Sequence, residues 1–261
     1  MRVLHLWSVS GVGEIIAREM DRSFGTTSTV LVRKKFDRFG YNTSPVADGR
    51  YRFALRSLLQ ARKNDVVQVH SWDEIVPWLK RFTSPPVVLT YHNFNIRKEW
   101  AARKKKHSRA DATVIATPGL ADGLEAVFIP DPVDTDLFFD THHHVKGTAL
   151  HTEYWATEDA QRIADERGLK LTVLRRQSSP VPHSEMPKLL NQYEYYIDVK
   201  RLPTKSPEII QATSKTCLEA LACGCKVIRW DEKVLEGLQD ENRPGYVARK
   251  YFELYSSLLK S

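Results

Sequence analysis

Residues 214–230 read SKTCLEALACGCKVIRW, a stretch that leads from a helix through a glycine directly into a β-strand. Ser214 is a favourable N-cap and Gly224 a favourable stop, so we expect a helix over 215–223. Its leucines recur at helical spacing and would pack on a sheet, whereas Glu219 lies one turn in, on another face. Glu219 is therefore either a surface residue beside the helix dipole or a group that binds a ligand.

Strands alternate with helices along most of the chain, and this alternation predicts parallel sheets covered by helices on both faces. The expected strands are residues 2–8, 27–34, 65–71, 85–92, 112–117, 127–131, 147–152, 169–176, 195–201 and 225–230. A helix is also expected over 118–126. The alternation pauses at 132–147. We therefore predict an α/β protein of two Rossmann-like domains, 1–135 and 148–243, with a linker at 136–147 and a C-terminal helix at 244–261 that packs back toward the first domain.

The composition is that of an ordinary soluble globular protein, with 42% hydrophobic and 27% charged residues. No stretch approaches the roughly 20 apolar residues of a membrane span, and the first residues lack the order of a signal peptide. The three cysteines form no disulfide framework and have no ligand cluster at zinc spacing, so we expect a cytoplasmic protein without a metal site. The histidines at 142–144 point in different directions and are interpreted as part of a polar linker.

The net charge of +7 is concentrated in the basic segments 32–39 and 97–111. Basic segments with interleaved aromatic residues can face nucleic acid, anionic lipid or a phosphorylated substrate, and they can also be solvated helix faces. The charge therefore predicts anionic partners without choosing among them.

Two motifs of the first domain are candidates for ligand binding. Gly11 and Gly13 in SGVGE follow the first strand and would let a ligand approach the amides of the next helix, although a tight turn alone also explains them. The motif lacks the full G-x-G-x-x-G spacing, which disfavours dinucleotide binding. His70 and His92 end neighbouring strands, where open parallel sheets bind their ligands.

The third motif is the beginning of the helix at 215–223. Ser214, Lys215 and Thr216 offer amides, hydroxyls and an ammonium group to a diphosphate. Glu219, one turn deeper, would accept hydrogen bonds from a ribose diol. This motif predicts a nucleotide site.

The segment CLEALACGCKVI (217–228) resembles the LEAMACGxPVV segment of the retaining, nucleotide-sugar-dependent glycosyltransferases of family 4, which have the GT-B fold of two facing Rossmann-like domains. The segments DVVQVHS, VVLTYHN and ADATVIATPGLADGLE, and VFIPDPVDTDLF after them, are also similar to this family. The resemblance implies hexosyl transfer from a UDP- or GDP-sugar, with no cofactor and no metal.

The resemblance also implies roles for particular residues. Glu219 corresponds to the second glutamate of the E-x7-E motif, and Gln211 stands where the first glutamate is expected. His92 would face the transferred sugar, and Gly11 and Gly13 would lie near the phosphates. The family's Gly-Arg pair after the first strand of the second domain is missing, so Lys215, Arg175 or Arg176 would supply the charge.

Three functions remain open at this point. The leading one is a glycosyltransferase with a glycan or anionic acceptor, cytoplasmic or in peripheral contact with an anionic membrane. The second is a catalytically silent module that binds a sugar nucleotide or a partner protein, which Gln211 and the missing Gly-Arg pair favour. Nucleic-acid binding through 97–111 is the least favoured.

Overall fold

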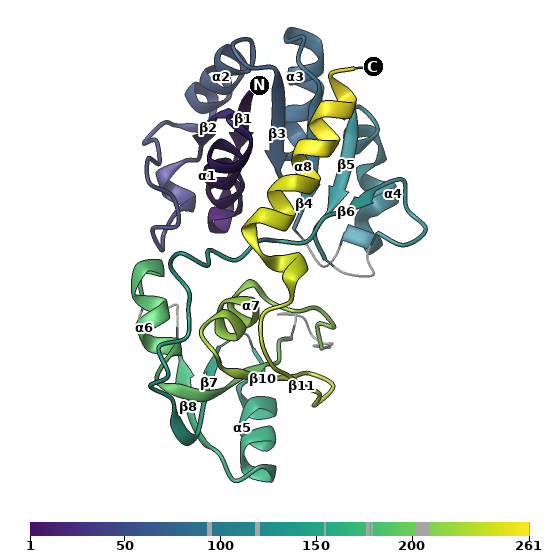
Figure 1. The fold of residues 1–261 in the computed structure, drawn as a ribbon. Coiled ribbons are helices and arrows are strands. Elements are labelled where there is room, and N and C mark those ends of the chain that lie inside the picture. Colours follow the sequence, from purple (N-terminus) through teal and green to yellow (C-terminus); the bar gives the residue numbers. More distant parts are fainter. Residues whose placement is uncertain are drawn as a thin grey trace. The chain divides into compact units, whose positions relative to one another are not determined.

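The computed structural model describes residues 1–92, 96–117, 121–153, 155–175, 178, 180–201 and 209–260 (Figure 1). The chain divides into two compact units, each described here by itself. Unit 1 comprises Met1–Pro132 and Glu241–Ser261, and unit 2 comprises Val133–Asp240. Each unit is a largely parallel sheet between layers of helices, so the predicted fold class of two Rossmann-like domains is confirmed.

The sheet of unit 1 has six parallel strands in the order β2-β1-β3-β4-β5-β6. The strands are β1 (Arg2–Leu6), β2 (Thr27–Leu31), β3 (Val66–His70), β4 (Val87–Tyr91), β5 (Ala112–Ile115) and β6 (Val127–Phe128). β3 and β4 are buried along their whole length, which fits their sequences VVQVH and VVLTY, in each of which three of five residues are β-branched.

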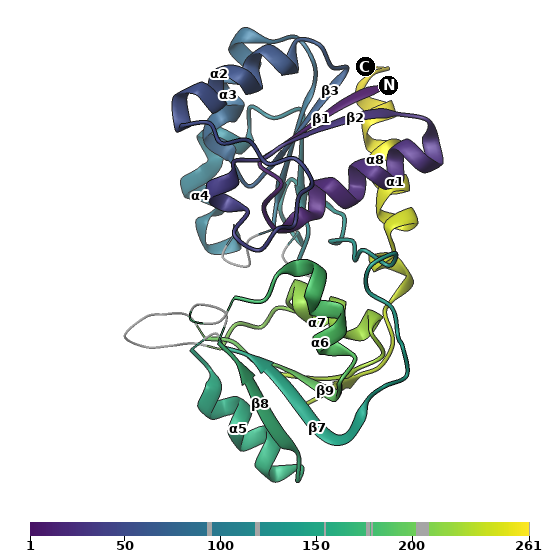
Figure 2. The same ribbon diagram turned by 90° about the vertical axis from the view of Figure 1, so that its left-hand side faces the viewer.

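Helices cover both faces of this sheet (Figure 2). One face carries α1 (Val12–Phe24) and α8 (Pro244–Leu258), and the other carries α2 (Arg50–Ala61), α3 (Val76–Phe82) and α4 (Ile96–His107). Phe24 and Phe252 stack at 4.4 Å between ring centroids, and the Tyr255 hydroxyl donates to Gln68 of β3. The C-terminal helix therefore packs into the first domain, as predicted.

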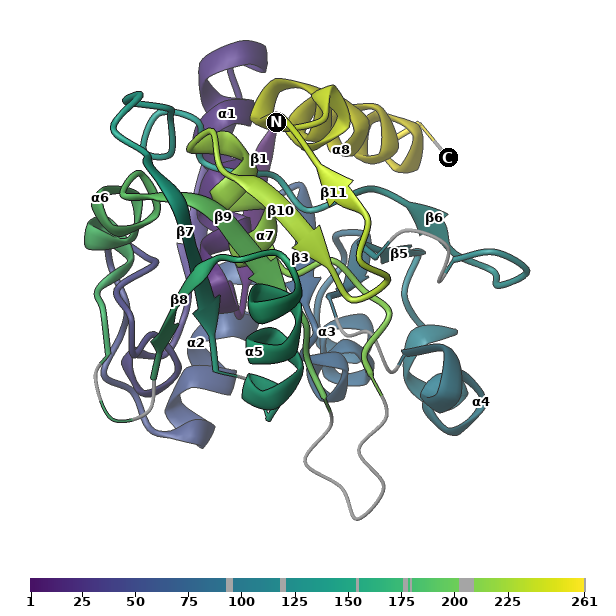
Figure 3. The ribbon, with the colours of Figure 1, turned by 90° about the horizontal axis from the view of Figure 1, so that it is seen from below.

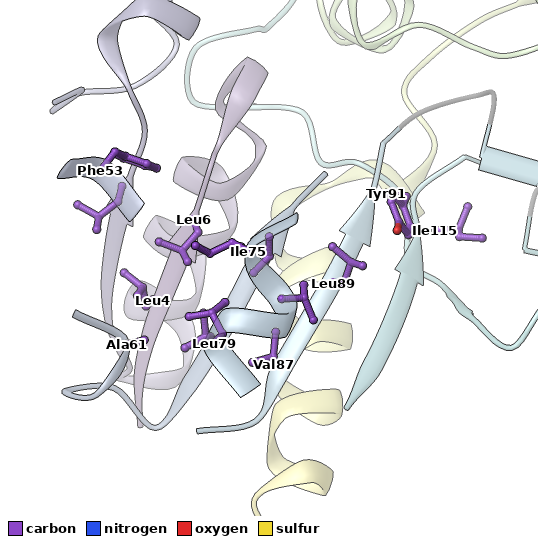
Figure 4. Close-up of a cluster of buried hydrophobic side chains, with 14 of the residues drawn as sticks. Leu4, Leu6, Phe53, Ala61, Ile75, Leu79, Val87, Leu89, Tyr91 and Ile115 are labelled. Atoms are coloured by element: carbon purple, nitrogen blue, oxygen red, sulfur yellow. The ribbon is translucent and has the colours of Figure 1, made fainter. Parts of the chain in front are cut away.

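The core beneath α2 and α3 is formed by side chains that the strands and these two helices share. Figure 4 shows Phe53 and Ala61 of α2 and Leu79 of α3 beside Leu4, Leu6, Val87 and Leu89 of the strands. All seven are fully buried. This burial fixes which faces of α2 and α3 are turned away from the sheet.

Unit 2 contains a five-stranded sheet in the order β11-β10-β9-β7-β8, parallel except for the edge strand β11 (Figure 3). Its strands are β7 (Val145–Thr152), β8 (Lys170–Leu174), β9 (Tyr193–Asp198), β10 (Lys226–Arg229) and β11 (Val234–Leu235). Helix α5 (Thr157–Glu166) packs on one face, and α6 (Met186–Leu190) and α7 (Lys215–Ala222) pack on the other. The expected linker contains Phe138, which is buried in the core of this unit.

The helix predicted over 118–126 is wrong for its described part, residues 121–126, which form turns. Gly123 has a left-handed φ of 74°, and the amide of Leu124 donates to the carbonyl of Ala121 at 3.0 Å. A glycine in that conformation ends helical hydrogen bonding. Residues 118–120 lie outside the described residues. No helix of the described residues is long and apolar enough to span a membrane.

The glycine that ends α7 is required by its surroundings. Gly224 has a left-handed φ of 83°, and a Cβ built on it would lie 2.3 Å from Oδ2 of Asp140. We expect Gly224→Ala to lower the free energy of unfolding by about 2–4 kcal/mol, since it adds backbone strain and displaces a hydrogen-bonded carboxylate. The control is Gly168→Ala, because Gly168 also has a left-handed φ, 64°, but no atom near its Cβ position. Urea unfolding measures both, and equal losses would contradict the role of Asp140.

Candidate functional site

In open parallel sheets, ligands bind at the carboxyl ends of strands where the chain order reverses. In unit 1 this point lies between β1 and β3, and in unit 2 it lies between β7 and β9. Four non-glycine residues with positive φ follow these strands: Trp7 and Ser10 after β1, Ser71 after β3, and Trp155 after β7. Backbone strain of this kind gathers at functional sites, so both switch points are candidates.

In unit 1, three histidines and an aspartate form a chain of contacts from β1 to the ends of β3 and β4. His92 Nδ1 lies 2.7 Å from Asp131 Oδ1, and His92 Nε2 lies 3.0 Å from His70 Nδ1. His70 Nε2 in turn lies 3.5 Å from His5 Nδ1. The structure thus brings His70 and His92 together, and it engages both ring nitrogens of His92 with other side chains.

Burial controls the protonation of the inner two histidines. Burial lowers the pKa of His5 to about 4, and burial together with the neighbouring His92 and His5 rings lowers the pKa of His70 well below its usual value. Both rings are therefore neutral at pH 7, and each must use one nitrogen as acceptor. Asp131 and His5 were not identified from the sequence.

The predicted glycines beside this chain have structural roles of their own. Gly11 caps α1 with a left-handed φ of 72°. A Cβ on Gly13 would lie 2.8 Å from Nε2 of His70 and 2.9 Å from Oγ of Ser8. The Ser8 hydroxyl is buried and has no hydrogen-bond partner among the described residues. The backbone conformation therefore accounts for Gly11 and close packing accounts for Gly13, while the buried hydroxyl of Ser8 lies before α1.

In unit 2, the start of α7 is built on the end of β9. Ser214 is the N-cap, as predicted, and its Oγ accepts from the amide of Cys217 at 2.9 Å. Its own amide and hydroxyl both donate to Asp198, at 2.9 and 2.8 Å. The hydrogen bonds of Ser214 are thus used to cap the helix. An anion at this place would be bound by the cationic side chains nearby.

Lys200 is one of those cations, and it was not predicted. Lys200 follows β9, and its Nζ lies 3.6 Å from Asp198 and donates to the carbonyl of Ala212 at 3.2 Å. Arg175 follows β8 and is exposed. Arg176, named with it from the sequence, lies outside the described residues. Lys200 was missed because only the fold brings it to α7.

Glu219 is buried inside a small polar cluster and is only 3% exposed. Its Oε1 accepts from Nε2 of His183 at 3.2 Å and lies 3.9 Å from Nζ of Lys215. Glu219 is therefore not a surface residue beside the helix dipole, because its partners hold the carboxylate in one orientation. His183 was missed from the sequence, 36 residues away.

The other two predicted residues of this region differ in exposure. Thr216 is nearly buried in the first turn of α7, and Gln211 is exposed in the segment before the helix. The structure shows no contact between Gln211 and Glu219 among the described residues. Residues 202–208, which precede Gln211, lie outside the described part of the chain.

A hollow of about 550 Å³ opens at the switch point of unit 2. It is lined by Trp155, which is exposed, and by the start of α5. Arg201 crosses it and binds Asp159 through two bonds of 2.6 and 2.7 Å. The paired arginine and the open indole offer a flat aromatic surface beside polar groups. Trp155 lies three residues after the end of β7, and it was not identified from the sequence.

The cysteines and the histidine run contain no ligand set for a metal. Cys217, Cys223 and Cys225 are buried free thiols, and burial raises the pKa of Cys223 and of Cys225 to about 12. In the histidine run, His144 contacts the carbonyl of Tyr193 and the carboxylate of Asp140. Across the residues that the structure describes, no group of three or more His, Cys, Asp or Glu side chains is arranged to hold a metal ion.

Comparison with known proteins shows that the first part of the chain is similar to a known family. Residues 14–136 match the model of Glycosyltransferase Family 4, a little less than half of the sequence and almost all of it in unit 1. No curated protein matches the sequence.

Solved structures match the whole chain at low sequence identity. An alpha-glucosyltransferase in complex with UDP and DNA has a TM-score of 0.57 at 13% identity, with 100% of this chain and 91% of that chain covered. Sucrose-phosphate synthase from Thermosynechococcus elongatus has a TM-score of 0.53 at 12% identity, with 99% and 92% covered. UDP-GlcNAc 2-epimerase from Neisseria meningitidis, bound to UDP-GlcNAc, has a TM-score of 0.52 at 10% identity, with 99% and 94% covered. These likenesses show the fold, which is of the GT-B type.

Proposed function

We propose that the protein is a glycosyltransferase that takes a sugar from a nucleoside-diphosphate donor bound at the switch point of unit 2. The family likeness of residues 14–136 and the fold shared with a UDP-bound glucosyltransferase support this proposal. The position of the polar residues of unit 2 at the carboxyl ends of β7 and β9 supports it further. Fold alone does not select transfer, because an epimerase shares it.

The observation that carries the proposal is the buried carboxylate of Glu219, held by His183 and Lys215 one turn inside α7. A buried carboxylate is costly unless it is bound, and the two partners leave part of its hydrogen-bonding capacity for a ligand. A ribose diol has the matching donors. Glu219 is accordingly the group that would bind the ribose.

The remaining parts of the donor match other groups of unit 2. The diphosphate would meet the ammonium groups of Lys215 and Lys200 and the guanidinium of Arg175, together with the first amides of α7. The nucleobase would stack on the indole of Trp155 in the hollow. In this proposal the cationic side chains stabilise the negative charge of the diphosphate, and no metal ion takes part.

The chemical step that fits this arrangement is a transfer with retention at the anomeric carbon. The acceptor hydroxyl oxygen forms a bond to that carbon, and the bond from the carbon to the phosphate oxygen breaks. The hydroxyl proton passes to the departing diphosphate, whose negative charge the cations of unit 2 stabilise. His92, with its ring fixed by Asp131 and His70, would border the transferred sugar. Gly11 and Gly13 would border the phosphates.

The acceptor is assigned to unit 1 by its charge. Helix α4 contains six lysines and arginines and one glutamate, and its Lys104 and Lys105 are exposed, which suits an anionic or a glycan acceptor. A cytoplasmic location is part of this proposal and accords with three reduced, buried cysteines.

A second candidate function is a module that binds a sugar nucleotide without transferring the sugar. Gln211 favours it, because this side chain is exposed and uncharged where the resembling family has a glutamate. Such a module would bind the donor through the same groups of unit 2. Binding tests the site in both cases, and turnover separates them.

The binding test uses Glu219→Gln, which keeps the shape of the side chain and removes its charge. Titration calorimetry with UDP- and GDP-sugars first identifies the donor that binds the parent. We expect the dissociation constant for that donor to rise about ten- to a hundredfold in the variant, because a charge-assisted hydrogen bond is lost. Glu185→Gln is the control, since Glu185 is exposed on the short helix that carries His183. An unchanged dissociation constant for Glu219→Gln would refute the ribose site.

A further inference from the structure

Helix α2 of unit 1 is apolar on two opposite faces. Its inner face places Phe53 and Ala61 against the sheet, as Figure 4 shows. Its outer face carries Tyr51, Leu55 and Leu59, which are 86%, 58% and 50% exposed. These three residues follow at intervals of four, so they form one stripe along the helix. These exposed side chains do not contribute to the core of unit 1, and contiguous exposed apolar residues often mark an interaction surface.

Helix α3 extends the apolar surface beside α2. Trp78 and Phe82 are 56% and 41% exposed, and their rings stack with centroids 5.8 Å apart. Arg62, just after α2, donates from Nε to the carbonyl of Phe82 at 3.1 Å and so joins the ends of the two helices. Both helices cover the face of the sheet opposite α1 and α8 (Figure 2).

Positive charge surrounds this apolar stripe. From residue 50 to residue 63 the sequence contains no acidic residue and five basic ones, namely Arg50, Arg52, Arg56, Arg62 and Lys63. Arg52 and Lys63 are exposed, whereas Arg56 pairs with Asp48 at 2.6 Å. Arg81 of α3 lies over the ring of Phe82 at 5.6 Å. Exposed leucines and aromatic rings among cations form the pattern of a helix that lies in a membrane interface.

The basic helix α4 lacks this pattern. Arg103 binds Asp73 at 2.7 Å, and Lys106 binds the same carboxylate at 3.2 Å, so part of its charge is neutralised within unit 1. The described part of its sequence carries no exposed stripe of large apolar residues. The cationic and the apolar requirements of a membrane surface are thus met together on α2 and α3.

We propose that the outer face of α2 and α3 is a docking surface for an anionic lipid bilayer. The leucines and aromatic rings would enter the interface, and the arginines and lysines would contact the phosphate groups of the lipids. A second copy of this chain fits the surface poorly, because a symmetric contact would bring the five cations of one α2 against those of the other. The proposal is independent of the sugar-transfer activity.

The test is sedimentation of the full-length protein with phosphatidylcholine vesicles, with and without phosphatidylglycerol. We expect binding only to the anionic vesicles, and weaker binding when salt rises from about 0.1 M to about 1 M. Leu55→Ser combined with Leu59→Ser should weaken binding at least about tenfold, because two apolar anchors are lost. Arg52→Gln combined with Lys63→Gln should also weaken it.

The matched apolar control is Tyr246→Ser combined with Val145→Ser, because these residues are 43% and 57% exposed. Tyr246 lies at the start of α8, on the face of the sheet opposite α2 and α3, and Val145 begins β7 of unit 2. The charge control is Lys104→Gln combined with Lys105→Gln on α4. Both control proteins should bind as the parent does. Circular dichroism and thermal unfolding establish that each variant is folded.

Several outcomes would overturn the proposal. These are a parent that does not sediment with anionic vesicles, equal binding by the α2 variant and the parent, or a loss confined to the α4 variant. If the parent forms a concentration-dependent dimer and the leucine variant stays monomeric, the surface binds a second copy of the chain. If the parent binds RNA or DNA but not vesicles, and the α2 variant binds neither, the surface binds nucleic acid.

Discussion

Replacing Lys215 by alanine is expected to lower the turnover of the donor by about ten- to a hundredfold. The ammonium group lies at the start of α7, 3.9 Å from the carboxylate of Glu219. In the proposed function it would contact the departing diphosphate. Loss of a charge-assisted contact that forms in the transition state costs about 1.5–3 kcal/mol. Released nucleoside diphosphate, measured at saturating donor, reports the effect on kcat.

Three further proteins make this result specific. Lys215→Arg should recover part of the turnover, since it restores the charge, and Lys233→Ala should match the parent, because Lys233 is 75% exposed in a turn. Gln211→Glu should change turnover only modestly, because in an active transferase the amide of Gln211 would orient a donor hydroxyl as a carboxylate does. Turnover that appears only in Gln211→Glu would show that the natural chain binds the donor without transferring the sugar.

The free energy of unfolding is expected to fall steeply as the pH drops below about 6.5. The pKa of His5 is about 4 in the folded protein and about 6.5 in the unfolded chain, so the unfolded state binds a proton that the folded state excludes. The stabilisation from this neutral histidine is complete above pH 6.5 and is lost as the pH falls toward 4. His5 alone accounts for about 3 kcal/mol, at about 1.4 kcal/mol per pH unit.

His70 acts in the same direction, because its pKa is also lowered by burial. Urea unfolding followed by circular dichroism at a series of pH values measures the slope. His5→Gln should be less stable than the parent at pH 7 and should show a shallower slope below pH 6.5. His143→Gln is the control, since His143 is exposed, and it should keep the slope of the parent. A parental slope in His5→Gln would contradict the burial argument.

The parts of the fold that the sequence predicts correctly depend on neighbouring residues. Ser214 and Gly224 mark the two ends of α7, and both signals act within a few residues. The strands predicted at 65–71 and 85–92 contain the buried strands β3 and β4, whose valine-rich sequences lie between helical segments. The helix predicted at 118–126 failed because Asp122-Gly123 forms a turn that the apolar spacing conceals.

The candidate site was harder to predict because its contacts join distant parts of the chain. His183 reaches Glu219 over 36 residues, Asp131 reaches His92 over 39, and His70 reaches His5 over 65. Each of these pairs depends on strand order, which the sequence of one element does not contain. A nucleotide site was nevertheless predicted at the start of α7, because a carboxylate within an apolar helix is a local signal.

Asp198 illustrates how the structure changes the meaning of a correct prediction. Ser214 was expected to bind a diphosphate, and it is indeed the N-cap of α7, but its amide and hydroxyl are both bound to Asp198. A carboxylate at this place partly offsets the positive end of the helix dipole. In the proposed function, the charge of a diphosphate would therefore be stabilised mainly by the ammonium groups of Lys215 and Lys200.

Release of nucleoside diphosphate by the unmodified protein, incubated in turn with UDP-, GDP- and ADP-sugars, tests the central claim most directly. The account predicts slow release from one class of donor without an acceptor, because a glycosyltransferase lets some sugar pass to water, and it predicts loss of this release in Glu219→Gln. The same titrations in calorimetry show whether a donor binds. A donor that binds the parent tightly and is never cleaved would contradict sugar transfer, and the absence of any donor binding would contradict the nucleotide site itself.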